Sequence, residues 1–106
     1  MNTIHQNRRA LSATEIVTQL TQLNGDAAQG WKLIDEALER AFAFPNFHET
    51  MAFVNALAWV AHREDHHPDL AVSYGRCTVR FNTHDVGGIS VSDFHCAAAV
   101  DALLKA

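Results

Sequence analysis

The sequence predicts an α+β fold: a two-layer domain in which a four-stranded antiparallel sheet carries three helices on one face. Three segments have apolar residues at helical spacing, and each begins with a polar residue typical of a helix N-cap. Between them lie two pairs of short segments in which apolar residues alternate. The order is therefore αββαββα, and hairpins separated by a helix typically form one antiparallel sheet covered by helices.

A chain of 106 residues is expected to form one domain, residues 1–106, because a second core would not fit. Residues 1–10 have no periodicity and predict a flexible N-terminal arm. The net charge is -4, and no stripe of Lys and Arg extends beyond Arg8 and Arg9. Direct nucleic-acid binding is therefore not expected, because such proteins carry a basic surface.

Two further features indicate a reduced, soluble environment. Cys77 and Cys96 have neither the spacing of a metal-binding pair nor the density of a disulfide scaffold, so both are expected to be reduced and buried. The N-terminus is polar, and no apolar run approaches the roughly 18 residues that a membrane span requires. A cytoplasmic protein without membrane association is expected.

The first helix is predicted to begin at Ser12, because Ser12 and Glu15 have the spacing of a capping box. Asn24 and Gly25 end it, since both residue types tolerate the left-handed conformation. A strand at Trp31–Leu33 and a second strand over residues 38–44 follow, with a turn at residues 35–37.

The second helix is predicted over residues 47–64, with Asn46 and Glu49 at cap spacing. It is apolar nearly all round. A helix that is apolar on more than one face is buried on more than one face. We therefore expect one face to cover the sheet and the other to meet a second subunit, the alternative being a helix deep within a single core.

After Pro68, residues 72–74 and 77–82 alternate as strands, with a hairpin turn at Gly75 and Arg76. Residues 83–88 are expected to form a loop. Ser90 and Asp93 then open the last helix with a third box-like spacing.

Histidines are concentrated at the end of the second helix, at His62, His66 and His67. Pro68 disfavours the helical conformation for His67, so the pair His66 and His67 straddles the helix end and both rings can face one cavity. The helix dipole and the acidic neighbours Glu64, Asp65 and Asp69 would favour a protonated imidazole. Histidine in a last helical turn, followed by proline, also occurs with no function attached.

The spacing of these residues along the chain resembles the signature of the pterin-4a-carbinolamine dehydratase family: His62-x3-His66-His67-Pro68-x5-Tyr74-x9-His84-x8-Asp93. Three further passages are similar to that family: Gly30-Trp31, Phe42-x-Phe44-x-x-Phe47, and Thr83-His84-x-x-Gly87-Gly88-Ile89-Ser90. The resemblance extends from about residue 11 to the end.

The resemblance implies an enzyme that removes water from 4a-hydroxytetrahydropterin and returns quinonoid dihydropterin for recycling. It places three catalytic histidines at His66, His67 and His84, with no metal and no cofactor, since the pterin is the substrate. We assign His66 as the principal acid/base, His84 as a second acid/base across the leaving group, and His67 mainly as a pterin-binding residue.

Five supporting residues complete the expected site: His62, Asp65, Pro68, Tyr74 and Asp93. Asp65 and Asp93 are expected to orient the imidazoles, although Asp93 is also explained as a residue of the first turn of a helix. His62 lies one helical turn before His66, where it could stack on that ring.

Two alternatives remain open. Members of the family also bind protein partners, so the chain could be a non-catalytic interaction or assembly-helper module, although such helpers tend to lose histidines that are present here. A zinc site formed by His66, His67, His84 and Asp93 is the other alternative. The expected partners are a pterin, further copies of the chain in a homodimer or homotetramer through helix 47–64, and an aromatic amino acid hydroxylase.

Overall fold

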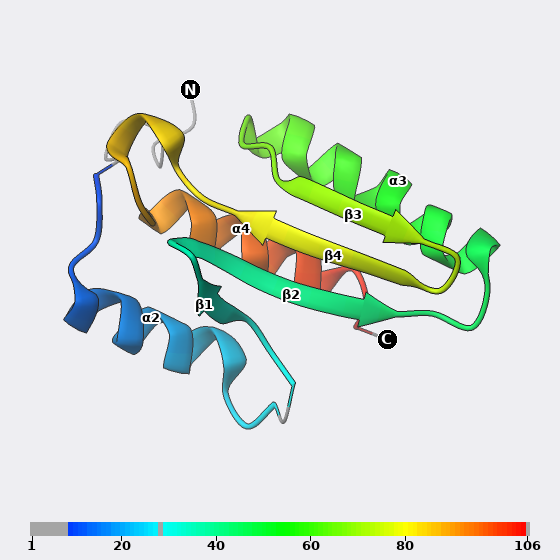
Figure 1. The fold of residues 1–106 in the computed structure, drawn as a ribbon, viewed down its shortest axis with the longest axis horizontal. Helices are drawn as coiled ribbons and strands as arrows, with labels where there is room; N and C mark the ends of the chain where they lie inside the picture. Colours follow the sequence, from blue (N-terminus) through cyan, green and yellow to red (C-terminus); the bar gives the residue numbers. More distant parts are fainter. Residues whose placement is uncertain (1–8, 28, 106) are drawn as a thin grey trace.

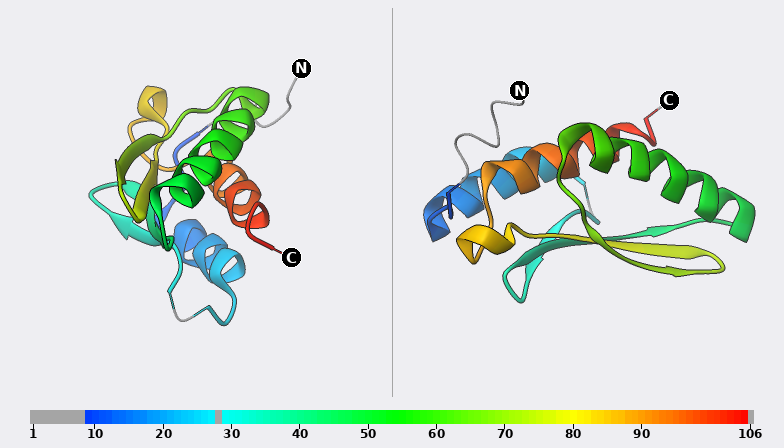
Figure 2. Two further views of the ribbon diagram at one scale, coloured as in Figure 1. Left: turned by 90° about the vertical axis from the view of Figure 1, so that its right-hand side faces the viewer. Right: turned by 90° about the horizontal axis from the view of Figure 1, so that it is seen from above.

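The computed structural model describes residues 9–27 and 29–105 and has the predicted α+β architecture, a four-stranded antiparallel sheet with three helices on one face (Figures 1 and 2). The arm predicted over residues 1–10 falls mainly on residues 1–8, which lie outside the described residues. The elements in chain order are α2 (Ala13–Asn24), β1 (Lys32–Ile34), β2 (Ala37–Ala43), α3 (Phe47–Glu64), β3 (Asp69–Ser73), β4 (Arg76–Phe81), the 3-10 turn η1 (His84–Val86) and α4 (Val91–Ala102).

The helix starts follow the predicted capping chemistry. Ser12 and Glu15 form a reciprocal capping box, in which the Ser12 N–H donates to the Glu15 carboxylate at 2.9 Å and the Glu15 N–H donates to the Ser12 hydroxyl at 3.2 Å. Asn46 accepts the Glu49 N–H at 2.8 Å, and α3 has the predicted bounds. These bonds satisfy N–H groups that have no partner within a first helical turn.

The first hairpin turn is shorter than predicted. Ile34 pairs with Ala37, so the turn contains Asp35 and Glu36 alone and Ala37 is the first residue of β2. Both turn residues have positive φ, 47° and 63°. This is the pattern of a two-residue turn whose twist matches that of the flanking strands, here formed without glycine.

The second hairpin turn is displaced by one residue from the prediction. Ser73 pairs with Arg76, so the turn is Tyr74–Gly75, with Tyr74 outside the strand and Arg76 within β4. Gly75 lies close to the end of β2: its carbonyl accepts the Phe44 N–H at 2.9 Å, and a Cβ built on Gly75 would lie 2.8 Å from the Phe44 carbonyl oxygen. This close approach places the glycine within the turn.

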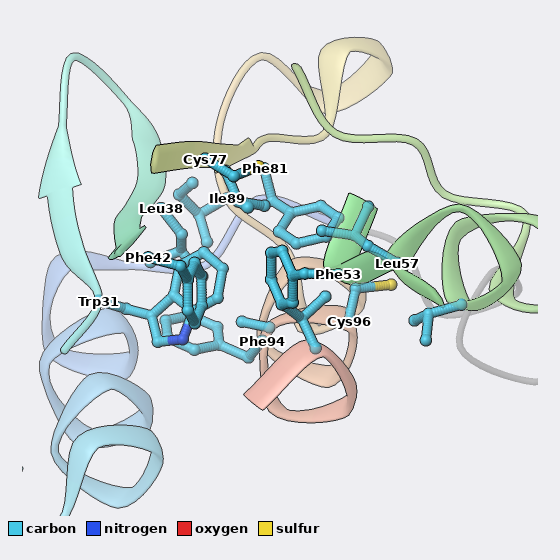
Figure 3. Packing of buried hydrophobic residues seen from close by; sticks show 14 residues of the cluster. Trp31, Leu38, Phe42, Phe53, Leu57, Cys77, Phe81, Ile89, Phe94 and Cys96 are labelled. Atoms are coloured by element: carbon cyan, nitrogen blue, oxygen red, sulfur yellow. The ribbon is translucent and has the colours of Figure 1, made fainter. Parts of the chain in front are cut away.

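The core lies between the helices and the inner face of β2 and β4, where aromatic rings dominate (Figure 3). Trp31 packs against Phe42 and Phe81 with ring centroids 6.1 and 5.9 Å apart. Cys77 on β4 and Cys96 on α4 are buried as predicted and are not joined in a disulfide. Burial raises the pKa of the Cys77 thiol.

Helix α3 is not enclosed within one core. Phe53, Leu57 and Val60 are buried, whereas Trp59 is 73% exposed and Phe47 is 49% exposed. The outer surface of α3 therefore carries two large exposed apolar residues among polar ones. Its coverage by another subunit stays a prediction.

Candidate active site

The end of α3 sets the orientation of the histidine pair. Asp65 has left-handed backbone angles, φ 50° and ψ 45°, a conformation that aspartate tolerates better than most residues. The Asp65 N–H donates to the His62 carbonyl at 3.2 Å, and the His66 N–H donates to the Ala61 carbonyl at 3.1 Å. This Schellman arrangement ends the helix, so that His66 turns inward and is 6% exposed, while His67 stays at the surface.

The His66 ring is fixed on two sides. Its Nε2 lies 2.6 Å from Asp93 Oδ1, and Asp93, at the start of α4, is fully buried. One face of the ring stacks on Phe81, with centroids 5.9 Å apart and planes inclined by 9°. Of the two carboxylates expected to orient an imidazole, Asp65 and Asp93, it is therefore Asp93 that bonds to the His66 ring.

Asp93 also caps the helix that carries it. Its Oδ2 accepts the Ser90 N–H at 2.8 Å and the Thr83 hydroxyl at 2.7 Å. The two explanations offered by the sequence, a first-turn cap and a partner of His66, therefore both apply, one to each carboxylate oxygen.

Thr83 was missed as a site residue by sequence reasoning, although the sequence contains a signal for it. Val79 and Phe81 are fully buried, and Thr83 continues their alternation with 1% exposure. A threonine on the buried side of a strand pattern needs a hydrogen-bond partner, and here the partners are Asp93 and Ser90.

A cavity of about 360 Å³ opens beside His66, a volume within the range of small-molecule sites. It lies between the end of α3 and the segment that follows β4. Its lining residues are Asp65, His66, His67, Asn82, Thr83, His84 and Asp85. The fold thus brings together the three predicted histidines, Asp65 and, through His66, Asp93.

A family model described as pterin 4 alpha carbinolamine dehydratase matches residues 9–103. The chain belongs to this pterin dehydratase family. A relative from Paracidovorax citrulli, provisionally named pterin-4-alpha-carbinolamine dehydratase, is 55% identical over 103 residues, which cover 93% of this chain and 84% of the relative. A Stenotrophomonas maltophilia relative with the same provisional name is 63% identical over 78 residues, or 72% of this chain and 67% of the relative.

Two solved structures extend the comparison of the pterin dehydratase fold. A transcriptional coactivator/pterin dehydratase from Brucella melitensis superimposes with a TM-score of 0.82 at 29% identity, covering 92% of this chain and all of that one. A pterin dehydratase-like protein identified as a RuBisCO assembly factor in the alpha-carboxysome has a TM-score of 0.62 at 25% identity, covering 72% and 90% of the two chains.

Four residues of the pterin dehydratase signature do not line the cavity: His62, Pro68, Tyr74 and Asp93, of which Asp93 reaches it through His66. The His62 ring packs edge-on against Trp59, with centroids 5.9 Å apart, on the outer side of α3. It does not stack on His66, because the left-handed Asp65 breaks the helical alignment of the two rings. Tyr74 is 67% exposed at the opposite end of β3, a five-residue strand that spans roughly 17 Å.

Among the acidic neighbours expected at His66, Glu64 pairs with other side chains. The buried Glu64 turns toward α4, where its carboxylate lies 3.0 Å from His95 Nε2 and 2.8 Å from Arg63 Nε. Asp65 lines the cavity, and the carboxylate in contact with His66 is Asp93. The carboxylate bonded to His66 therefore comes from a residue 27 positions away in the sequence.

Over residues 9–27 and 29–105, no three His, Cys, Asp or Glu side chains are placed to hold a metal ion. The geometry gives no support to the zinc alternative. Within the same ranges, no helix is long and apolar enough to cross a membrane.

Proposed function

We propose that this protein is a 4a-hydroxytetrahydropterin dehydratase that uses histidine as general acid and base. Membership of the pterin dehydratase family supports the substrate class. The observation that carries the proposal is the cavity in which His66, backed by Asp93 at 2.6 Å, lies with His67 and His84.

The elimination requires two proton transfers. The N5–H bond breaks and its proton goes to a base, while its electron pair forms the N5=C4a double bond. The C4a–O bond breaks with its electrons on oxygen, and an acid supplies the proton that turns this oxygen into water. Imidazole, with an unperturbed pKa of about 6.5, can perform either transfer near neutral pH.

The three histidines differ in exposure in a way that suits the roles assigned to them. His66 is buried and fixed, as a principal acid/base should be. His84 is exposed on η1, on the other wall of the cavity, where it can exchange protons with solvent as the second acid/base. His67, at the mouth, would bind the pterin. In the cell, we propose a cytoplasmic role in recycling tetrahydropterin beside an aromatic amino acid hydroxylase.

A spectrophotometric dehydration assay on His66→Ala and His84→Ala tests this proposal. Loss of a general acid or base is expected to lower kcat by about 10²- to 10⁴-fold. His48→Ala is the matched control, since His48 is exposed in the first turn of α3 and outside the cavity. Undiminished rates in both cavity variants would contradict the proposal.

A second candidate, an interaction or assembly-helper module, is favoured by the exposed Trp59 on α3 and by the similarity to the RuBisCO assembly factor. The two functions use different surfaces of the molecule. Full dehydratase activity in a variant altered at Trp59 would separate them.

A further inference from the structure

A line of buried polar groups runs behind the cavity wall. Ser90 Oγ lies 2.6 Å from Thr83 Oγ1, Thr83 Oγ1 lies 2.7 Å from Asp93 Oδ2, and Asp93 Oδ1 lies 2.6 Å from His66 Nε2. Ser90 and Asp93 are fully buried, Thr83 is 1% exposed and His66 is 6% exposed. These four side chains come from the end of α3, the segment after β4 and the start of α4, and tertiary folding brings these three segments together.

The direction of every hydrogen bond in this line follows from the chemistry of Asp93. An imidazole is a stronger base than a carboxylate, so the shared proton lies on His66 Nε2 and Asp93 only accepts. The Thr83 hydroxyl has one hydrogen and donates it to Asp93 Oδ2. Ser90 must then donate its own hydroxyl hydrogen to Thr83 Oγ1.

This directionality leaves one ring nitrogen of His66 available for chemistry. With Nε2 held as a donor, neutral His66 has its lone pair on Nδ1. No hydrogen bond joins Nδ1 to another residue in the described part of the chain, and His66 lines the cavity. A molecule bound in the cavity therefore meets His66 as a proton acceptor.

We infer that Thr83 and Ser90 are positioning residues that hold Asp93 and thereby fix His66 as the Nε2–H tautomer, with Nδ1 as the catalytic base. The catalytic part of this inference, the role of Nδ1 as a base, rests on the proposed dehydratase function. In that reaction Nδ1 takes the N5 proton, and a protonated His84 supplies the proton that leaves with the C4a oxygen as water. Because the overall reaction releases only water, the proton gained by His66 returns to His84 through solvent.

The tautomer can be read without any substrate, from long-range ¹⁵N–¹H NMR spectra of the imidazole nitrogens at a pH where His66 is neutral. The His66 signals are assigned by their absence in His66→Gln. In the unmodified protein we expect a protonated Nε2 and a bare Nδ1. Asp93→Asn is expected to invert this pattern, because an amide NH₂ turned toward Nε2 makes that nitrogen the acceptor.

Thr83→Val removes the hydroxyl and keeps the shape of the side chain. It is expected to give mixed tautomers at His66 and to lower kcat about tenfold with KM within about twofold, as for the loss of one hydrogen bond to a charged group. Thr83→Ser should restore both. Thr78→Val is the control, since Thr78 is half-buried on β4 and its hydroxyl bonds to no described residue.

Two results would overturn the inference: an Nδ1–H tautomer in the unmodified protein, which needs no folded variant, or Thr83→Val with an unchanged tautomer and kcat. Absence of dehydratase activity in the unmodified protein would refute the proposed function alone, because the tautomer would still be measured. The positioning role of Thr83 would be supported, with or without dehydratase activity, by three results together: an Nε2–H tautomer in the unmodified protein, a mixture of tautomers in Thr83→Val, and the Nε2–H tautomer again in Thr83→Ser.

Discussion

At the scale of single residues, His66 is held by contacts from three directions. Its backbone is held by the Schellman turn at Asp65, its ring face by Phe81 and its Nε2 by Asp93. Each contact removes a degree of freedom that the exposed His67 and His84 retain. In the proposed dehydratase, a general base held in this way would lose little entropy when the substrate arrives.

His62 is expected to contribute little to catalysis despite its place in the signature. His62→Ala should leave kcat/KM within about twofold of the unmodified value, because its ring lies against Trp59 outside the cavity. Steady-state dehydration kinetics beside His66→Ala check this. A loss as large as that of His66→Ala would show that His62 reaches the substrate.

The sequence identified the residue types of the site better than their contacts. His66, His67, His84 and Asp65 share a cavity as expected, although the helix ends at the left-handed Asp65, before the pair, instead of between its two residues. The pairing of His66 with Asp93 spans 27 residues, and no local pattern fixes which carboxylate an imidazole meets. The positions of His62 and Tyr74 depend on backbone angles that were not readable from spacing.

At the scale of elements, the start of α2 has a predictable dependence on pH. The hydrogen bond from Arg9 is the main cause that lowers the pKa of Glu15 from 4.5 to about 2, and the Ser12 backbone N–H adds to it. A lowered pKa contributes stability above the ordinary pKa, and this contribution is lost as the pH falls through about 2.

Glu15→Gln should therefore flatten this acid dependence while keeping a side chain that can complete the capping box. Urea unfolding followed from neutral to acidic pH measures the midpoint of both proteins. We expect the unmodified protein to lose stability more steeply below about pH 4.5. Parallel curves for the two proteins would contradict the assignment.

Gly75→Ala should destabilise the protein by about 1–3 kcal/mol, because the new Cβ would lie 2.8 Å from a backbone oxygen of Phe44 that cannot easily move. Tyr74→Ala, in the same turn with an exposed side chain, is the control. Chemical denaturation of both variants gives the free energies of unfolding. Equal stability in the two would rule out a steric cause.

Helix ends were predictable to the residue where a side chain caps them, as at Ser12 and Asn46, since the cap is a local bond. The positions of the hairpin turns were predicted less accurately. Asp35 and Glu36 adopt positive φ without glycine, and the position of Gly75 is set by its contact with β2. Neither the positive φ of the first turn nor the contact of the second turn with β2 can be predicted from the spacing of residues in the sequence.

At the scale of the whole molecule, the two layers leave Trp59 and Phe47 exposed on the outer side of α3. We expect the protein to form dimers or tetramers through this helix. Light scattering at micromolar concentration should give an oligomer for the unmodified chain and a smaller species for Trp59→Glu.

Val17→Glu is the matched control for that experiment, because Val17 is 64% exposed on α2, away from the proposed interface. It should leave the oligomer intact. A monomeric unmodified protein would contradict the prediction. So would an equal effect of the two substitutions.

The reactivity of the two buried cysteines can also be used to measure ligand binding. Cys77 and Cys96 lie in β4 and α4, the elements that carry Phe81 and Asp93, and burial raises the pKa of Cys77. A thiol reagent can label them only after these layers open. A pterin that binds only the closed form should slow the labelling of the thiols. The rate should fall by a factor of one plus the ratio of the free pterin concentration to its Kd. Binding in the cavity can then be measured without turnover.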